Sequence, residues 1–290
     1  MTGGPPSRRL LLVHAHPDDE TLMTGGTIAH YLAAGVDVAV VTFTLGEEGE
    51  VIGPQWAGLA ADGGADQLGG FRIGELAAAL AALSPDGSEP LAPRFLGGAG
   101  RWRDSGMAGS PASRNPRALV QAPLTDVVEA LIGELRAFDP HVVITYDAAG
   151  TYGHPDHRRV HEACAAALAR YTGETGRAVK VYESITAATA LRAGLAAAAD
   201  RVPAGWRLPG PGELPSYPDD EITAQIDVSA VRGRKVAALA AHATQVTVAP
   251  SATEYALSNN IVQPIGTVEY YRRVDAPGSG RETDLFEGVR

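Results

Sequence analysis

Short apolar runs alternate with segments of helical periodicity along the first half of the chain, and this alternation limits the possible folds most strongly. The apolar runs cover residues 9–15, 36–44 and 141–147. The helical segments cover residues 21–35, 66–82 and 123–140. Strands that alternate with helices form a mainly parallel sheet that is covered on both faces. The sequence therefore predicts an α/β fold with helices on both faces of a mainly parallel sheet.

The pattern is weaker after residue 172. Residues 179–185 predict a strand, residues 187–199 a helix, and the Pro- and Gly-rich stretch 203–218 an irregular excursion. We expect residues 1–172 to form the main domain. Residues 173–290 are expected to form a smaller α/β lobe that completes it.

Composition narrows the classes of partner. The chain has 290 residues, 45% of them hydrophobic, a net charge of −10 and a pI near 5.3. Nucleic acids and anionic membrane surfaces require a basic footprint, so neither is expected as a partner. A neutral or weakly charged small molecule fits this charge better.

The single cysteine and the N-terminal residues indicate the cellular compartment of the protein. Cys164 lies in an Ala-rich stretch, so we expect a buried thiol and no internal disulfide. The apolar run before His14 is too short for the core of a signal peptide, and no stretch reaches the length of a membrane span. These features predict a cytoplasmic protein.

The sequence HAHPDDE, residues 14–20, places two histidines and three carboxylates directly after the first apolar run. Burying such groups unpaired is costly, and adjacent carboxylates resist ionising together. A bound cation would offset the cost of burial and the repulsion between the carboxylates.

A second polar cluster, TYGHPDH at residues 151–157, follows the third apolar run. Proline is favoured in the first turn of a helix, so Pro155 predicts a helix start within this cluster. Parallel strands joined by right-handed crossovers bring their carboxyl ends to one edge of the sheet, so we expect the two clusters to meet there.

Two histidines and a carboxylate with an open position form a hydrolytic metal site that lowers the pKa of a bound water to about 7. We assign His16, Asp19 and His157 to one metal ion, either Zn²⁺ or Fe²⁺. Asp18 is then the candidate general base, and His154 the candidate acid or oxyanion stabiliser. Asp156 is expected to orient His154.

Simpler interpretations compete with these assignments. Each cluster alone is compatible with capping of the next helix or with a solvated loop. His14 is interpreted as a hydrogen-bonded residue at a strand end. His161 is expected to be solvated or to support a ligand, although chelation together with His157 is an alternative, and His242 is expected to be a cation at a helix C-terminus.

Other catalytic devices lack their sequence signatures. The chain contains no Walker A motif, no G-x-S-x-G elbow and no cysteine cluster. The Gly-rich segment 96–106 does not match G-x-G-x-x-G. Its Arg101, Arg103 and Asp104 suit hydrogen bonds to a polar ligand, and a surface turn with solvated arginines is the alternative.

AHPDDE with a distant HPDH resembles the PIG-L/LmbE-like zinc deacetylase family, which removes acetyl groups from N-acetylglucosamine-type sugars on a Rossmann-like fold. Further stretches resemble the branch of this family that acts on N-acetylglucosaminyl-inositol in mycothiol biosynthesis. These stretches are TLGEEGEVIG (44–53), DQLGGFRIGEL (66–76), LGGAGRWRDSGMAG (96–109) and AALAAHATQV (237–246). The resemblance covers nearly the whole chain, and RWRDSGM is its most specific part.

The resemblance implies the same three metal ligands and the same general base. It also implies Tyr152 as a mobile side chain that polarises the amide carbonyl, His154 as the acid, and Arg72 and Asp104 as contacts to sugar or inositol. Where the family has a sequence like YDPNGGYGHPDH, this chain has YDAAGTYGHPDH. Thr151 replaces a glycine there, and we expect it to restrict Tyr152.

These features predict a metal-dependent deacetylase that acts on N-acetylglucosaminyl-inositol. A related amidase that cleaves mycothiol S-conjugates is the nearest alternative, and Gly153 favours the deacetylase over it. A non-catalytic sugar-binding module that retained the metal site is an alternative from a different class.

Overall fold

A computed structural model describes residues 7–275 and 281–289. Its main sheet has seven strands in the order β3-β2-β1-β4-β5-β10-β6. The strands are β1 (Arg9–His14), β2 (Asp37–Thr42), β3 (Arg94–Phe95), β4 (Val142–Thr145), β5 (Lys180–Ile185), β6 (Ala224–Asp227) and β10 (Val268–Arg273). β3, β2, β1, β4 and β5 pair in parallel, whereas β10 is antiparallel to both of its neighbours. The prediction of a mainly parallel α/β fold is confirmed.

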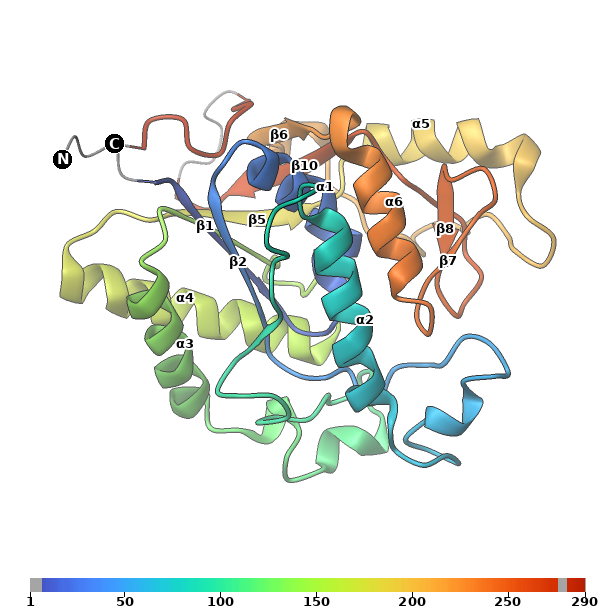
Figure 1. Cartoon of the computed structure of the whole chain (residues 1–290), viewed down its shortest axis with the longest axis horizontal. Coiled ribbons are helices and arrows are strands. Elements are labelled where there is room, and N and C mark those ends of the chain that lie inside the picture. Colours follow the sequence, from blue (N-terminus) through green and yellow to red (C-terminus); the bar gives the residue numbers. More distant parts are fainter. Residues whose placement is uncertain (1–6, 276–280, 290) are drawn as a thin grey trace.

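Helices cover the two faces of this sheet (Figure 1). α1 (Asp19–Ala33), α2 (Leu68–Leu83) and α6 (Arg232–Ala241) pack together on one side. α3 (Leu124–Phe138) and α4 (Pro155–Thr175) pack together on the other. α5 (Ala188–Ala198) lies near the small antiparallel sheet formed by β7 (Thr247–Val248), β8 (Glu254–Ala256) and β9 (Gln263–Pro264).

β1 shows why the sequence has this pattern. Leu10 and Leu12 face the core with α1, α2 and α6, while Leu11 and Val13 face the core with α3 and α4. Successive side chains of a strand point to opposite faces, so a strand buried on both faces is apolar throughout. The continuous run 10–13 therefore identifies β1 as a central strand.

The second half of the chain continues the same sheet. Position 172 lies inside α4, and β5, β10 and β6 extend the sheet beyond β4. The division into two parts near residue 172 stays a prediction about domain organisation.

Two smaller expectations can be compared with the structure. Cys164 is buried, as predicted. None of the helices in the described ranges is both long and apolar enough to cross a membrane.

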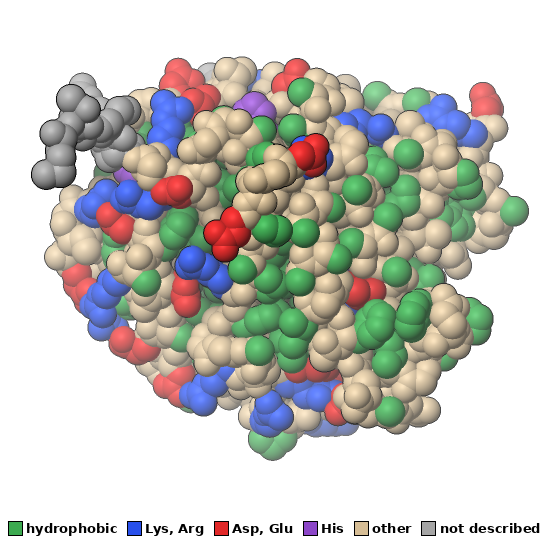
Figure 2. All heavy atoms as spheres, viewed as in Figure 1, with side chains coloured by type: hydrophobic (Ala, Val, Ile, Leu, Met, Phe, Trp, Pro, Cys, Tyr) green, Lys and Arg blue, Asp and Glu red, His purple; other side chains and the backbone are tan. Residues whose placement is uncertain are grey.

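Acidic and basic side chains are interspersed over the face in Figure 2.

Candidate metal centre and active site

The two polar clusters meet where the strand order reverses. The chain runs outward from β1 to β2 and β3 and then returns to place β4 on the other side of β1. Both clusters follow the carboxyl ends of these neighbouring parallel strands, because α1 begins at Asp19 and α4 at Pro155. Ligands bind α/β sheets at this kind of switch point. The predicted meeting of the clusters is confirmed.

The three predicted metal ligands lie together and are buried. Asp19 Oδ2 is 3.3 Å from His16 Nδ1 and 3.4 Å from His157 Nε2. Burial acts to raise the pKa of Asp19, but His157 and His16 outweigh it and hold this pKa well below its usual range. Asp19 is thus a carboxylate that contacts both histidines.

Two sets of three buried residues bring ligand atoms within 4.8 Å of one another. Among the described residues they are His16, His154, His157 and His16, Asp104, Asp156, and neither set includes Asp19. Within the described residues, both ring nitrogens of His157 are buried without a hydrogen-bond partner. Buried polar atoms are normally paired, and a metal ion bound through Nε2, the nitrogen 3.4 Å from Asp19 Oδ2, would give that atom a partner.

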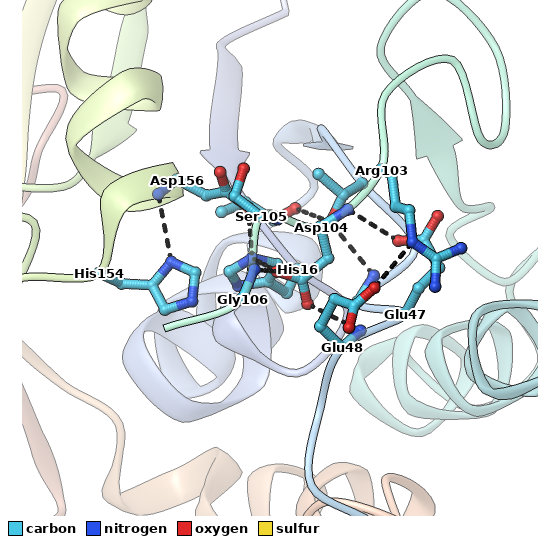
Figure 3. Close-up of polar contacts among 12 residues, drawn as sticks. His16, Glu47, Glu48, Arg103, Asp104, Ser105, Gly106, His154 and Asp156 are labelled. Atoms are coloured by element: carbon cyan, nitrogen blue, oxygen red, sulfur yellow. Dashed lines mark hydrogen bonds and ion pairs between the residues drawn. The ribbon is translucent and has the colours of Figure 1, made fainter. Parts of the chain in front are cut away.

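Asp156 contacts a different partner from the one expected. Its Oδ2 lies 3.2 Å from His16 Nε2 and accepts a hydrogen bond from the backbone N–H of Ser105 at 2.9 Å (Figure 3). Only its backbone N–H contacts His154, donating to Nδ1 at 3.2 Å. Asp156 lies in the first turn of α4, where the amide faces the residue before the helix and the side chain projects toward β1. The carboxylate therefore supports His16 in this structure.

The segment around Asp104 forms another side of the site (Figure 3). Asp104 Oδ1 lies 3.4 Å from His16 Nε2 and accepts the Gly106 N–H at 2.8 Å. Arg103 is paired with Glu48 at 2.8 Å and with Asp66 at 2.7 Å. These ion pairs tie the Gly-rich segment to neighbouring loops, so Arg103 has a positioning role that neither sequence interpretation anticipated.

Asp18 occupies a strained position at the N-terminus of α1. Its φ is +117° and its ψ is −34°, a region that non-glycine residues rarely adopt and that costs about 1–3 kcal/mol. Its Oδ2 is 3.1 Å from Arg72 Nη2. Burial raises the pKa of Asp18 to about 6, and the charge of Arg72 opposes this increase.

Arg72 is almost completely buried, with 2% of the residue exposed. Besides pairing with Asp18, it donates hydrogen bonds to the carbonyls of Gly46, at 2.7 Å, and Pro17. In this structure the guanidinium supports the loop that carries Asp18. Its expected contact with sugar or inositol stays a prediction.

Tyr152 lies at the open edge of the cluster and is 53% exposed. Its ring centroid is 5.2 Å from that of His157 and 6.0 Å from that of His154. Thr151 precedes it with a φ of +61°, which is unfavourable for a β-branched residue. Asp147 Oδ1 accepts the Thr151 N–H at 3.1 Å, and Tyr217 donates to Asp147 Oδ2 at 2.8 Å.

Tyr146 is a site residue that the sequence interpretation missed. Its hydroxyl donates to Asp19 Oδ2 and accepts the Ala15 N–H, each at 2.7 Å. Its ring stacks on His157 with centroids 4.1 Å apart. The available signal was its place directly after β4, where a side chain emerges at the carboxyl edge of the sheet.

The structure can be compared with the interpretations of three further histidines, His14, His161 and His242. His14 ends β1 and lies 3.2 Å from Thr24 Oγ1, so its interpretation as a hydrogen-bonded strand-end residue is confirmed. His161 Nδ1 is 3.0 Å from the Tyr146 carbonyl, and His161 belongs to neither candidate metal set. His242 does follow α6, but it is fully buried and pairs with Glu20 at 2.8 Å. The interpretation as a simple helix-end cation missed this long-range partner.

The sheet and its site define an α/β protein with a candidate metal centre at the switch point. Residues 11–168 match the PIG-L family, described as GlcNAc-PI de-N-acetylase, and the chain belongs to this family. A Gordonia bronchialis protein named 1D-myo-inositol 2-acetamido-2-deoxy-alpha-D-glucopyranoside deacetylase is 70% identical over 282 residues, covering 97% of this chain and 100% of that protein. A Rhodococcus erythropolis protein of the same name is 56% identical, covering 98% of each chain.

Solved structures show the same fold. The N,N'-diacetylchitobiose deacetylase from Pyrococcus horikoshii matches with a TM-score of 0.56 and 17% identity, covering 98% of this chain and 87% of that one. At this identity the match supports the architecture alone. The family description and the names of the two relatives agree on removal of an N-acetyl group.

Proposed function

We propose that this protein hydrolyses the N-acetyl group of 1D-myo-inositol 2-acetamido-2-deoxy-α-D-glucopyranoside, releasing acetate and the free amine in mycothiol biosynthesis. The observation that carries this proposal is the 70% identity to the Gordonia bronchialis deacetylase over the whole of that protein. The buried cluster of His16, Asp19 and His157 next to Asp18 supplies residues suited to amide hydrolysis.

His16, Asp19 and His157 would hold one metal ion, which we take to be zinc, with ferrous iron as the alternative for the same donor set. A bound zinc ion supplies a Lewis acid and lowers the pKa of water at the site to about 7. Support for a metal here comes from His157 Nε2, which has no hydrogen-bond partner among the described residues, and from the carboxylates that surround His16.

Asp18 is the proposed general base that accepts a proton from the attacking water. A base works best when its pKa lies near the working pH. Burial raises the pKa of Asp18 to about 6, so most of this carboxylate is ionised at pH 7. Arg72, at 3.1 Å, stabilises the charged form.

His154 is proposed to stabilise the oxyanion. The Asp156 N–H donates to Nδ1, so a neutral ring carries its proton on Nε2. Burial and the neighbouring His16 and His157 lower the pKa of His154 to about 3, so the resting ring is neutral. An N–H donor is suited to the charge that develops on the acetyl oxygen.

A neutral His154 must take up a proton at Nδ1, and so give up the hydrogen bond from the Asp156 N–H, before it can protonate the leaving amine. Asp18 gains a proton from water earlier in the reaction and is the proposed source. Tyr152, exposed at the edge of the cluster, is proposed to polarise the acetyl carbonyl, and Asp104 to contact the sugar or inositol.

The test is acetate release from N-acetylglucosaminyl-inositol by purified protein of measured metal content. Asp18→Asn, which keeps the shape of the side chain, and a chelated sample serve as controls. We expect release that requires metal and that falls strongly in Asp18→Asn. Cleavage of a mycothiol S-conjugate without acetate release would favour the amidase, and substrate binding without turnover would favour a sugar-binding module.

A further inference from the structure

A buried ion pair outside the metal cluster joins the two halves of the chain. Glu20, in the first turn of α1, contacts His242, which directly follows α6, with 2.8 Å between Oε1 and Nε2. Both side chains have no exposed surface. We propose that Glu20 and His242 are positioning residues that hold Asp18 in its strained backbone conformation and aim its carboxylate at the reacting centre. This inference rests on the proposed function, in which Asp18 is the base.

Glu20 acts on Asp18 through the backbone. Its Oε2 accepts the Asp18 N–H at 2.9 Å. An aspartate at this position of a helix usually turns its own carboxylate onto the N–H groups of the first turn. In the described structure the Asp18 side chain makes no such capping bond. The bond from Glu20 holds the backbone, so the carboxylate of Asp18 faces Arg72 and the site.

His242 in turn fixes Glu20. Oε1 of Glu20 accepts from His242 and from the Thr21 hydroxyl, while Oε2 is engaged by Asp18. Both carboxylate oxygens are therefore occupied, and the group cannot rotate without losing partners. Because the carboxylate lies in a buried environment, these bonds define one orientation.

The segment that begins at His242 also contacts α2, the helix whose Arg72 pairs with Asp18. Thr244 donates from its N–H and its hydroxyl to the Glu75 carboxylate, at 2.8 Å and 2.7 Å. Glu75 lies three residues after Arg72 on α2, and Arg72 contacts the Asp18 carboxylate. α1, α2 and α6 lie side by side in Figure 1. The segment 242–244 thus contacts both Glu20, which holds the Asp18 backbone, and α2, the helix that carries Arg72.

A second buried pair, between Glu269 of β10 and Lys235 of α6, also contacts α1 and provides a matched control. Glu269 pairs with Lys235 at 2.6 Å and accepts the N–H groups of Gly26 and Thr27 at 2.8 Å and 2.7 Å. Like Glu20, it is a buried carboxylate that accepts backbone N–H groups in or next to α1 and pairs with a basic residue of α6 or of the position directly after it. Its partners lie farther along α1, away from Asp18, so it reports on a structural role alone.

The test compares Glu20→Ala, Glu20→Gln and Glu269→Ala in kcat, KM, bound metal and urea unfolding. We expect Glu20→Ala to lower kcat about 100-fold, the order expected for misplacement of a catalytic group, with KM and bound metal unchanged. Glu20→Gln retains an oxygen that can accept the Asp18 N–H and should recover most of kcat. Glu269→Ala should lose stability but keep the kcat of its folded fraction.

His242 variants test the same inference if Glu20→Ala fails to fold. His242→Gln can still donate to Glu20, whereas His242→Leu cannot, so kcat should be higher in His242→Gln. Equal kcat in these two variants, or a kcat loss in Glu20→Ala no larger than that in Glu269→Ala, would overturn the inference.

Crystal structures of the wild type and His242→Leu supply a readout that needs no turnover. We expect Asp18 to leave its positive φ and its carboxylate to separate from Arg72 in the variant. An unmoved Asp18 would overturn the positioning role. If the wild type released no acetate, the proposed function would fail, and these structures would still decide whether Glu20 and His242 hold Asp18.

Discussion

Removal of the Tyr146 hydroxyl is expected to weaken metal binding without changing any metal ligand. This hydroxyl bridges Asp19 Oδ2 and the Ala15 N–H, with 2.7 Å on each side. Tyr146→Phe keeps the ring that stacks on His157, so the substitution deletes only the two hydrogen bonds. Asp19 then loses a charge-assisted bond, and a buried backbone N–H loses its acceptor.

The size of each effect follows from the type of bond that is lost. Loss of a partner that orients a metal ligand lowers metal affinity about 10- to 100-fold, or about 1.4–2.7 kcal/mol. The unpaired Ala15 N–H should reduce the free energy of unfolding of the metal-free protein by about 1–3 kcal/mol.

Competition against a chromogenic chelator measures the first effect, and urea unfolding of the metal-free protein measures the second. Tyr171→Phe is the matched control, because Tyr171 is also buried and donates to a carboxylate, Asp139, near the amino ends of β1 and β4. It should lose stability and retain metal affinity. Metal affinity at the wild-type level in Tyr146→Phe would refute the reasoning.

Three further predictions concern Asp18 and the loop that carries Tyr152. Asp18 must be ionised to act as a base, so kcat/KM should fall as the pH drops below about 6, and a bound cation would lower the pH of this acidic limb of the profile. An acidic limb above pH 7 would contradict the assignment. Arg72→Met should move the acidic limb of the pH profile to higher pH, because the charge of Arg72 lowers the pKa of Asp18. It should also lower the free energy of unfolding in urea by about 3–5 kcal/mol, because the buried carboxylate of Asp18 loses its ion-pair partner. Thr151→Gly removes about 1–2 kcal/mol of left-handed strain and adds about 0.5–1 kcal/mol of chain entropy to the unfolded state. The free energy of unfolding should therefore rise by no more than about 1.5 kcal/mol, while kcat rises. An unchanged kcat would show that Thr151 does not restrict Tyr152.

The first half of the fold could be predicted because its signals are local. Continuous apolar runs identified β1, β2 and β4 as buried strands, and helical spacing identified the helices between them. The antiparallel placement of β10 between β5 and β6 could not be predicted in this way. The partners of β10 are distant from it in sequence, so no local period specifies the order of these strands.

The candidate site, like the fold, could be predicted only in part from the sequence. The sequence by itself determined which residues gather at the carboxyl edge, because His16, Asp19 and His157 each follow a strand whose direction is set by parallel topology. Only the tertiary structure decided their partners. The Asp156 carboxylate faces His16, and His242 reaches Glu20 across more than 200 residues. Such contacts depend on how helices pack and how side chains project from them, and short sequence patterns do not encode that geometry.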